Sequence, residues 1–462
     1  MAYAAIIARV KVSPHPDPEV HSLAVGTVLG NTLIVGKDTP DGALGVFFPA
    51  DGQLSPEFAK ANNLIRVTDS AGHRIGGGLF DENRRVRVAK IRGVKSEGFW
   101  CELASLEFVA KPSDYFDLVE GFEFDTLNGV PICNKYITAA TRQAMAKEAK
   151  DEKKGKVKET KSSKMFPKHF DTAQFLQNAW RLKEGDIVTL TEKLHGTSQR
   201  LCHAQQPTLL KTLYGRFLTF LSVFFGKPHW RKYLPQWKYL VGTRNVTLNE
   251  EEVKGSWYGK EGFRFTVIKH LMPELLTDKT VQPGKLNKGE MLYFEVVGWT
   301  ENGRAIMEPY KLKEKALKKR FGDHMHFSYG CEAPECNDPT HGGKPSTDMY
   351  VYRITQVNED GQEVDLPWEA VKQRCELLNV KYVPELCPRF IYDGNLEALT
   401  ERIKELTEDK ASLLDQKHFM EGACVRVEAY PRPLVMKYKT FAFRLGESEQ
   451  KDTGVADTEE AA

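Results

Sequence analysis

The sequence predicts an α+β protein in which a small β-rich N-terminal domain precedes a larger mixed α/β domain with antiparallel sheets. Over residues 1–135, short runs of alternating apolar and polar residues are separated by turns rich in Gly, Pro and Asp. That rhythm is typical of a small barrel or sandwich. From Phe170 onwards, helical patterns at Pro367–Leu378 and Leu396–Leu414 alternate with strand-like runs such as MLYFEVVGW and GACVRVEAY.

Composition limits the classes of protein that fit this chain. The 462 residues are 41% hydrophobic, which is enough for two or three domains and excludes global disorder. A formal net charge of +2 excludes a histone-like polycation but leaves room for a basic surface that binds nucleic acid. Residues Met1–Val10 do not resemble a secretory signal and the 8 cysteines are scattered. We therefore expect a reducing, cytoplasmic setting with free thiols.

The apolar run Leu209–Phe225 is the stretch to test as a membrane span. It carries Lys211 and Arg216 and is too short for a bilayer core of about 30 Å. Its apolar residues recur every three or four positions, which favours an amphipathic helix on a core. No transmembrane segment is predicted.

Shifts in composition mark the expected domain boundaries. From Lys147 to Lys168, 9 lysines accompany 4 acidic residues, which predicts a Lys-rich linker over residues 136–168, either a soluble tether or a phosphate-binding strap. Residues 447–462 contain 6 acidic residues and one lysine and are expected to be a disordered acidic tail. The α/β domain then covers residues 169–446.

The segment Thr191–Ser198, TEKLHGTS, contains the first candidate for chemistry. Lys193 ends a β-type run, and a glycine lies three residues later. A lysine amine becomes a nucleophile when its pKa is depressed or when it lies beside another cation. A glycine lets the backbone approach a ligand closely. Lys-X-X-Gly alone is weak evidence for a nucleophile, and it gains weight only from matching segments later in the chain.

Five later segments place charged or aromatic residues on strand-like runs. They are VGTR with Arg244, YFEVVG with Glu295, YVYRI with Tyr350 and Tyr352, EGACVR with Glu421, and VMKYK with Lys437 and Lys439. Side chains alternate along a strand, so the two lysines of VMKYK share one face. Each segment alone could be structural, as a paired charge, a core aromatic or a solvated face. Six in this order indicate one site.

In this order the six segments resemble the collinear motifs of the covalent nucleotidyltransferase superfamily of ATP-dependent ligases and capping enzymes. The histidine of Lys-X-His-Gly, His195, resembles the RNA ligase branch. ARVKVSPHPDPEVHSLAVG and RRVRVAKIRGVKSEGFWCEL resemble the OB domain of template-dependent, nick-sealing RNA ligases. The resemblance implies that residues 1–135 form an OB-type β-barrel that binds nucleic acid, and that a nucleotidyltransferase domain comes after it.

The resemblance also implies a role for each matched residue. Lys193 would attack the α-phosphate of ATP, the AMP donor, and form a lysyl–AMP intermediate. Glu192 would contact the adenine, and Tyr350 would stack on it, with Tyr352 as second choice. Arg244 and Glu295 would hold the ribose or phosphate, and Glu295 and Glu421 would bind Mg²⁺ or Mn²⁺. Lys437 and Lys439 would neutralise the charge on the α-phosphate. His195 would orient pyrophosphate or the end being joined.

The implied function is an ATP-dependent RNA ligase that joins 3′-OH and 5′-phosphate ends at nicks in RNA or RNA/DNA hybrid duplexes, through an AMP-capped 5′ end. A monomer with a role in RNA repair is expected. One alternative is a capping-type guanylyltransferase, which His195 and the lack of a segment resembling a C-terminal OB domain after Lys439 disfavour. The other is an RNA-binding OB protein with a degenerate catalytic domain, although every expected catalytic residue is present.

Two features lie outside the resemblance. Residues 205–240 carry basic residues interleaved with aromatic ones and no acidic residue, which suits either nucleic-acid contacts or a packed helical insert. Cys331, Cys336 and His341 have a spacing that could bind zinc but lack a second strong pair of ligands.

Overall fold

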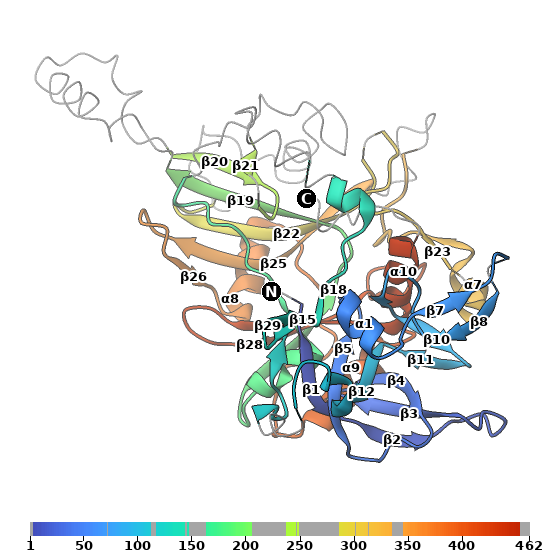
Figure 1. The fold of residues 1–462 in the computed structure, drawn as a ribbon. Coiled ribbons are helices and arrows are strands. Elements are labelled where there is room, and N and C mark those ends of the chain that lie inside the picture. Colours follow the sequence, from blue (N-terminus) through green and yellow to red (C-terminus); the bar gives the residue numbers. More distant parts are fainter. Residues whose placement is uncertain are drawn as a thin grey trace, which may run out of the picture.

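The computed structural model describes residues 3–71, 73–111, 117–143, 146, 163–205, 237–245, 247–248, 286–300, 302–312, 314–334 and 345–452. The chain is α+β with mainly antiparallel sheets, as predicted. Figure 1 shows the N-terminal part, drawn in blue, lying against one side of a larger part that contains two sheets.

The N-terminal part consists of small antiparallel sheets. One has the order β12-β5-β1-β13, from Gly98–Glu102, Leu44–Pro49, Ala5–Arg9 and Glu123–Phe124. The others are β2-β3-β4 (Lys11–Pro14, Leu23–Val28, Asn31–Gly36), β16-β6-β9 (Cys133–Lys135, Gly52–Leu54, Arg85–Val86), β7-β8 (Arg66–Thr68, Arg74–Gly77), β10-β11 (Ala89–Ile91, Val94–Ser96) and β14-β15 (Thr126–Leu127, Val130–Pro131). Helix α1 (Pro56–Ala61) and the 3-10 turn η1 (Leu103–Leu106) connect them. Over the described residues the strands pair as separate sheets and not as one closed barrel, so the OB-type barrel stays a prediction.

Alternating burial explains why these short runs become strands. In β4 every second residue is buried, as expected where one face of a sheet covers a core and the other faces water. Two apolar clusters result, one around Phe48 and Phe58 and the other around Phe47 and Trp100.

The larger part contains two sheets. The first has the order β21-β20-β19-β22-β25-β26, from Thr247–Leu248, Trp237–Gly242, Thr197–Gln205, Glu290–Gly298, Thr347–Val357 and Glu363–Asp365. The second has the order β17-β29-β28-β18-β27, from Ala173–Gln174, Leu434–Lys439, Gly422–Val427, Ile187–Lys193 and Phe390–Ile391. A separate pair is β23-β24 (Tyr310–Lys311, His324–Met325). Strand β22 is central and almost wholly buried, which fits its near-continuous apolar run.

Helices cover the two sheets with their apolar faces. Helix α8 (Trp368–Leu378) packs into the core of the first sheet, and its end at Asn379 has the left-handed conformation that commonly terminates helices. Helix α9 (Leu396–Thr407) packs onto the second sheet. The predicted helix up to Leu414 is too long, because Glu408 is extended and Asp409 has a positive φ. The shorter helical elements are α3 (Phe175–Asn178), η3 (Ala179–Arg181) and α7 (Lys315–Phe321).

Two predicted boundaries are wrong, namely the end of the linker at residue 168 and the start of the acidic tail at residue 447. Met165 and Phe166, assigned to the linker, are buried with Cys202 and Tyr293, so the folded larger part begins before residue 169. The chain is also helical beyond Glu447, since α10 runs Phe441–Asp452. Its buried face explains the error: Glu447, Glu449 and Asp452, three of the acidic residues on which the prediction of disorder depends, lie on a helix whose Phe443 and Ser448 are packed in the interior.

Several predictions fall on residues outside the described ranges. These are most of the linker, residues 206–236 of the basic-aromatic insert with the run Leu209–Phe225, Cys336 and His341 of the zinc hypothesis, and residues 453–462 of the tail. All the described cysteines are free thiols, as expected. Among the described residues, no helix has the length and apolar character needed to cross a membrane.

Candidate active site

Lys193 lies at the end of β18, where the second sheet aligns it with two other functional candidates. Antiparallel pairing places Lys193 opposite Gly422, and Gly422 opposite Lys439. Residues aligned across a sheet point to the same face, so Lys193 and Lys439 share a face. Gly422 is required between them, because a Cβ there would lie 1.9 Å from the carbonyl oxygen of Tyr438.

The next row of the same face brings in the other lysine of VMKYK. Thr191 pairs with Cys424, and Cys424 pairs with Lys437. Strand alternation therefore places both lysines on the face that carries Lys193, as the sequence predicts. Cys424 lies between Thr191 and Lys437 in the register of the sheet. Burial raises the pKa of its thiol to about 11, so the thiol is protonated near neutral pH.

Glu421 is the negative centre of this group. Its side chain is completely buried, and its Oε1 lies 2.6 Å from Lys193 Nζ. Lys439 Nζ is 3.8 Å from the same oxygen, and His195 Nδ1 is 3.8 Å from Oε2. A buried carboxylate is stable only when it is paired, so Glu421 holds the nucleophile candidate in place.

His195 is fixed by its surroundings. Its backbone N–H donates to the hydroxyl of Tyr329 at 2.6 Å. Its ring lies edge-on against Phe327 and Phe443, with centroid distances of 4.8 Å to each. This packing lets His195 face Glu421 but gives its ring little freedom.

A cavity of about 170 Å³ lies beside Lys193, with lining residues from both sheets. The predicted site residues in its lining are Glu192, Lys193, Arg244, Glu295 and Lys437. His195, Glu421, Lys439 and Tyr350 are described but lie outside the lining. The structure thus brings eight of the nine predicted residues into one region, as a cavity wall and a buried ionic group behind it, and Tyr350 belongs to neither.

Glu192 is a buried carboxyl group of the cavity wall. Its side chain is nearly inaccessible, and its Oε2 accepts a hydrogen bond from the backbone N–H of Leu413 at 3.0 Å. Burial raises the pKa of Glu192 to about 7, although the hydrogen bonds from Ser412 and Leu413 oppose the shift. Glu192 therefore changes charge near neutral pH.

We expect this shift to appear in the pH dependence of stability. Between pH 4.5 and 7 the unfolded chain ionises Glu192 while the folded chain keeps the proton, so the free energy of unfolding falls as pH rises. Glu192→Gln has no carboxyl group to ionise at this position, so its free energy of unfolding does not fall for this reason. Relative to the wild type, the stability of the variant should increase by roughly 3 kcal/mol between pH 4 and pH 8 in urea unfolding. An identical pH dependence in both proteins would contradict the burial of an ionisable Glu192.

The β22–β25 pairing explains the position of the aromatic side chains. The register shifts between Tyr293 and Phe294, so Tyr352 is the additional residue on β25. A bulge of this kind redirects side chains that simple alternation would place. Sequence alternation cannot reveal it.

The cavity lining contains Tyr352 and not Tyr350, the first choice from the sequence, although Tyr350 pairs with Glu295 of the lining. Tyr352 lines the cavity, with its hydroxyl 2.8 Å from Ser198 Oγ. Tyr350 is 5% exposed and packs in the main core, where its hydroxyl donates to Asp348 at 3.2 Å.

Sequence reasoning missed a second set of lining residues. His169, Phe170 and Thr172 come from the segment that precedes β17, and Arg353 and Trp368 complete this wall. The guanidinium group of Arg353 lies 4.6 Å from the Phe170 ring centroid. Burial, with Arg353, lowers the pKa of His169 to about 3, so His169 is neutral. The available signal was KHFDT, an aromatic pair directly before a strand, next to a segment assigned to the linker.

Arg244 reaches the cavity from the end of β20. Its Nη2 lies 2.6 Å from Asp171 Oδ1, and its carbonyl oxygen accepts from the backbone N–H of His169 at 3.1 Å. The segment around Asp171 therefore holds Arg244 at the cavity rim.

Comparison with known proteins identifies a family and a shared fold. A family model described as RNA ligase matches residues 186–439, more than half of the chain. By structure the chain is similar to Naegleria gruberi RNA ligase. A lysine-to-alanine mutant with ATP and Mn gives a TM-score of 0.51 at 15% identity, covering 97% of this chain and 99% of that one.

Two other forms of the same protein give similar values. An apo aspartate-to-alanine mutant has a TM-score of 0.50 at 17% identity, over 98% and 99% of the two chains. The form with PPi has a TM-score of 0.50 at 16% identity, over 97% and 98%. At sequence identities this low, the structural similarity shows a shared fold and nothing further. A search of curated protein sequences finds no match.

Proposed function

This chain belongs to the RNA ligase family, and we propose that it uses ATP to join 3′-OH and 5′-phosphate ends at nicks in a duplex containing RNA. The observation that carries this proposal is the placement of Lys193. It lies against the buried carboxylate of Glu421, on one sheet face with Lys437 and Lys439, at the wall of a cavity.

In the first step Lys193 Nζ attacks the α-phosphorus of ATP. The N–P bond forms, the bond between the α-phosphorus and the bridging oxygen breaks, and pyrophosphate leaves. The amine must lose a proton before it attacks, and Glu421 Oε1, 2.6 Å from Nζ, is the group placed to accept it. The neighbouring cations Lys437 and Lys439 favour that loss, whereas the negative charge of Glu421 opposes it. The same lysines face the negative charge that develops on the α-phosphate. An oxygen of the 5′-phosphate then attacks the phosphorus of lysyl–AMP, the N–P bond breaks and the Lys193 amine leaves. The 3′-OH finally attacks the 5′-phosphate, the phosphodiester bond forms, the bond to AMP breaks and AMP leaves.

The carboxylates fit a divalent cation. Glu295 at the cavity wall and Glu421 behind Lys193 offer the oxygen donors that Mg²⁺ and Mn²⁺ prefer. Within the described residues, no three His, Cys, Asp or Glu side chains gather as a metal cage, so phosphate oxygens and water would complete the coordination. When bound, the cation would neutralise phosphate charge. The ATP and Mn named for the N. gruberi ligase support this assignment.

For the adenine, we propose Glu192 as the polar contact and Tyr352 as the stacking partner. Tyr352→Ala should raise the ATP KM by about 5- to 150-fold, since base–aromatic stacking is worth about 1–3 kcal/mol in ground and transition states alike. Tyr352→Phe keeps the ring and should change the KM far less. Tyr350→Ala should instead lower the melting temperature, because it empties a core site. Adenylation kinetics and thermal melts of the three variants distinguish these roles, and an unchanged KM in Tyr352→Ala would exclude Tyr352 as the stacking partner.

The N-terminal part offers a surface for the nucleic acid. A second cavity, of about 370 Å³, is lined by Arg66, Arg85, Arg87, Lys90 and Arg92, together with Phe80 and Phe99 and the acidic residues Asp81 and Asp452. Arg85 is buried and pairs with Asp452, so the more exposed Arg87, Lys90 and Arg92 would make the phosphate contacts. The part as a whole has more acidic than basic residues, so this cationic group is local.

The experiment that tests the function is sealing of a panel of nicked duplexes. The strands that carry the 3′-OH, the 5′-phosphate and the template are varied between RNA and DNA. We expect ATP-dependent sealing when the 3′-OH strand ends in RNA. Labelling of the protein by GTP in preference to ATP, with no sealing of any nick, would instead favour a capping-type guanylyltransferase.

A further inference from the structure

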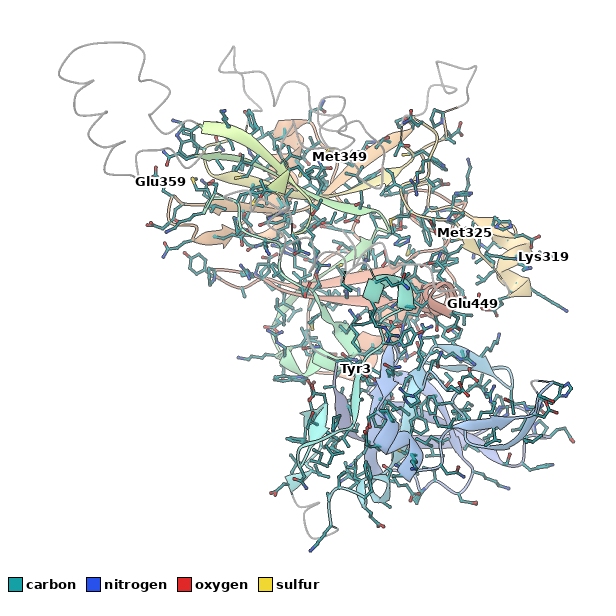
Figure 2. The ribbon with its side chains drawn as sticks, turned by 45° about the horizontal axis from the view of Figure 1, so that its top comes forward. Tyr3, Lys319, Met325, Met349, Glu359 and Glu449 are labelled. Atoms are coloured by element: carbon teal, nitrogen blue, oxygen red, sulfur yellow. The ribbon has the colours of Figure 1, made fainter. Side chains whose placement is uncertain are left out.

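The C-terminal helix α10 lies between Lys439 and the N-terminal part. Figure 2 labels Glu449 of this helix where the two parts meet. We propose that α10 positions Lys439 through Glu447, and that contacts with the N-terminal part hold α10 in place; we call this arrangement the α10 bracket. Glu447 is then a positioning residue for the phosphate site. This inference rests on the proposed role of Lys439 in nucleotidyl transfer.

One face of α10 holds Lys439. Its Nζ lies 2.7 Å from Glu447 Oε1 and 5.0 Å from the ring centroid of Phe443. The side chains of Lys439 and Glu447 are 10% and 14% exposed, so water screens this ion pair much less than a surface pair. Phe443 and Glu447 are four residues apart and therefore lie on the same side of the helix. Phe443 also packs on His195.

Thr440 anchors the start of the helix to the segment that contains Glu421. Its backbone N–H donates to the Glu421 carbonyl at 2.8 Å, and its hydroxyl donates to the Met420 carbonyl at 3.0 Å. The helix can therefore not shift at its start without moving Glu421, the partner of Lys193.

The other face of α10 contacts the N-terminal part. Arg444 Nη1 lies 2.8 Å from Glu97 Oε1. One helical turn later, the Ser448 carbonyl accepts from Arg85 Nη1 at 3.0 Å. The same Arg85 nitrogen lies 2.6 Å from Asp452 Oδ1. Arg444, Ser448 and Asp452 are spaced by four residues, which makes a single stripe along the helix.

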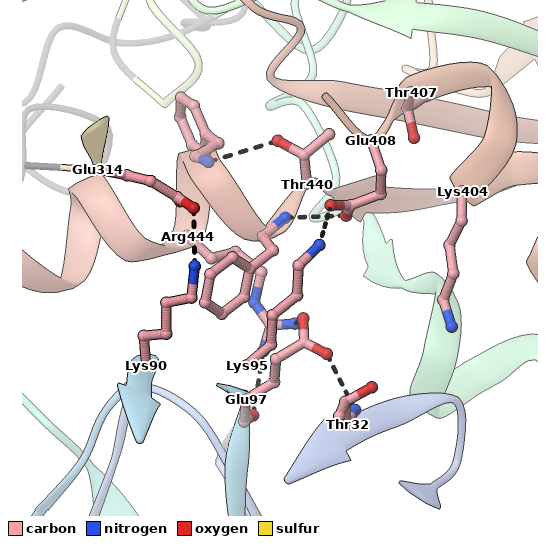
Figure 3. Close-up of polar contacts among 12 residues, drawn as sticks. Thr32, Lys90, Lys95, Glu97, Glu314, Lys404, Thr407, Glu408, Thr440 and Arg444 are labelled. Atoms are coloured by element: carbon pink, nitrogen blue, oxygen red, sulfur yellow. Dashed lines mark hydrogen bonds and ion pairs between the residues drawn. The ribbon is translucent and has the colours of Figure 1, made fainter. Parts of the chain in front are cut away.

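Two further ion pairs close the contact. Lys451 Nζ lies 3.2 Å from Asp51 Oδ1. Lys95 Nζ lies 3.0 Å from Glu408 Oε2, while Glu408 Oε1 accepts from the Tyr438 hydroxyl at 2.7 Å and from the Phe441 backbone N–H at 2.9 Å. Figure 3 shows the Lys95–Glu408 and Glu97–Arg444 pairs side by side. The N-terminal part thus reaches the strand that carries both catalytic lysines.

Electrostatics also connects the two parts at this point. Burial opposes ionisation of Asp51, but Lys451, Arg85 and Lys439 together hold its pKa below its usual value. Lys439 therefore lies within electrostatic reach of an N-terminal carboxylate as well as of Glu447 and Glu421. Its position depends on groups from both parts of the chain.

The test is the rate of covalent adenylation of the full-length protein at saturating labelled ATP. Glu447→Gln keeps the size of the side chain and an oxygen that can accept from Lys439, but it removes the charge. We expect a rate about 10-fold lower with little change in ATP KM, because the ion pair that positions Lys439 is replaced by a weaker neutral hydrogen bond. Glu405→Gln, which removes an exposed charge from α9, is the matched control and should be neutral. An unchanged or faster rate in Glu447→Gln would overturn the proposal.

A double-mutant cycle separates positioning from a general effect on the fold. If Glu447 acts through Lys439, then Glu447→Gln should have no further effect in a Lys439→Met background. Equal slowing in both backgrounds would overturn the proposal, and this comparison stays valid even if the variants lose some stability.

The contribution of the N-terminal part is tested at Glu97. Glu97→Ala removes the partner of Arg444 and should slow adenylation about 3- to 10-fold, whereas Glu102→Ala, an exposed site in the same part, should not. A normal rate in Glu97→Ala would overturn the bracket. The proposed function itself would fail in a different experiment, if Lys193→Ala were labelled as strongly as the wild type.

Discussion

Lys193→Ala is expected to abolish covalent labelling of the protein by radiolabelled ATP in the presence of Mg²⁺. In the proposed reaction the Lys193 side chain supplies the attacking nitrogen, so its removal leaves no amine at that position. Loss of a nucleophile commonly costs about 10³-fold or more in rate. The buried Glu421 loses its ion-pair partner in this variant, so folding must be checked by circular dichroism.

Lys193→Arg keeps the positive charge next to Glu421 and removes the nucleophilic amine. It should therefore be folded and unlabelled, which separates chemistry from structure. Lys183→Ala, at an exposed position before β18, is the control and should be labelled normally. Undiminished labelling of either Lys193 variant would refute the assignment of the nucleophile.

Much of this site can be predicted from sequence order and strand alternation. Lys193, Lys437 and Lys439 each end or lie on a strand, and alternation alone places the last two on one face. The apolar run around Glu295 predicts a central strand, and β22 is one. These features are local, so a single segment contains the information that predicts them.

The parts that could not be predicted depend on pairing between distant segments. The bulge at Tyr352 exists only because β25 pairs out of register with β22. The second half of α10 falls in the segment predicted to be disordered, and its helix has a buried face and contacts Arg85 and Glu97, more than 300 residues earlier. Phe170 belongs to the cavity because Arg353 lies next to it. No local pattern contains these partners.

The other large effect is expected from Lys437, the lysine of VMKYK that lines the cavity itself. It aligns through Cys424 with Thr191, two residues from the nucleophile candidate. In the proposed reaction its ammonium group would face the negative charge that grows on the α-phosphate as the pyrophosphate leaves. Interactions that strengthen only in the transition state change kcat more than KM.

Lys437→Ala should therefore slow adenylation at saturating ATP by about 10²–10³-fold, the usual effect of removing one such electrostatic group, with a much smaller change in the ATP KM. Lys437→Arg should recover part of the rate, because it restores charge with different geometry.

Lys410→Ala, at an exposed position after α9, is the control. Lys437 is only partly buried and belongs to none of the apolar cores, so the melting temperature should change little. Single-turnover labelling over a range of ATP concentrations gives both constants, and a raised KM with an unchanged saturating rate would mean that Lys437 binds ATP and does not stabilise the transition state.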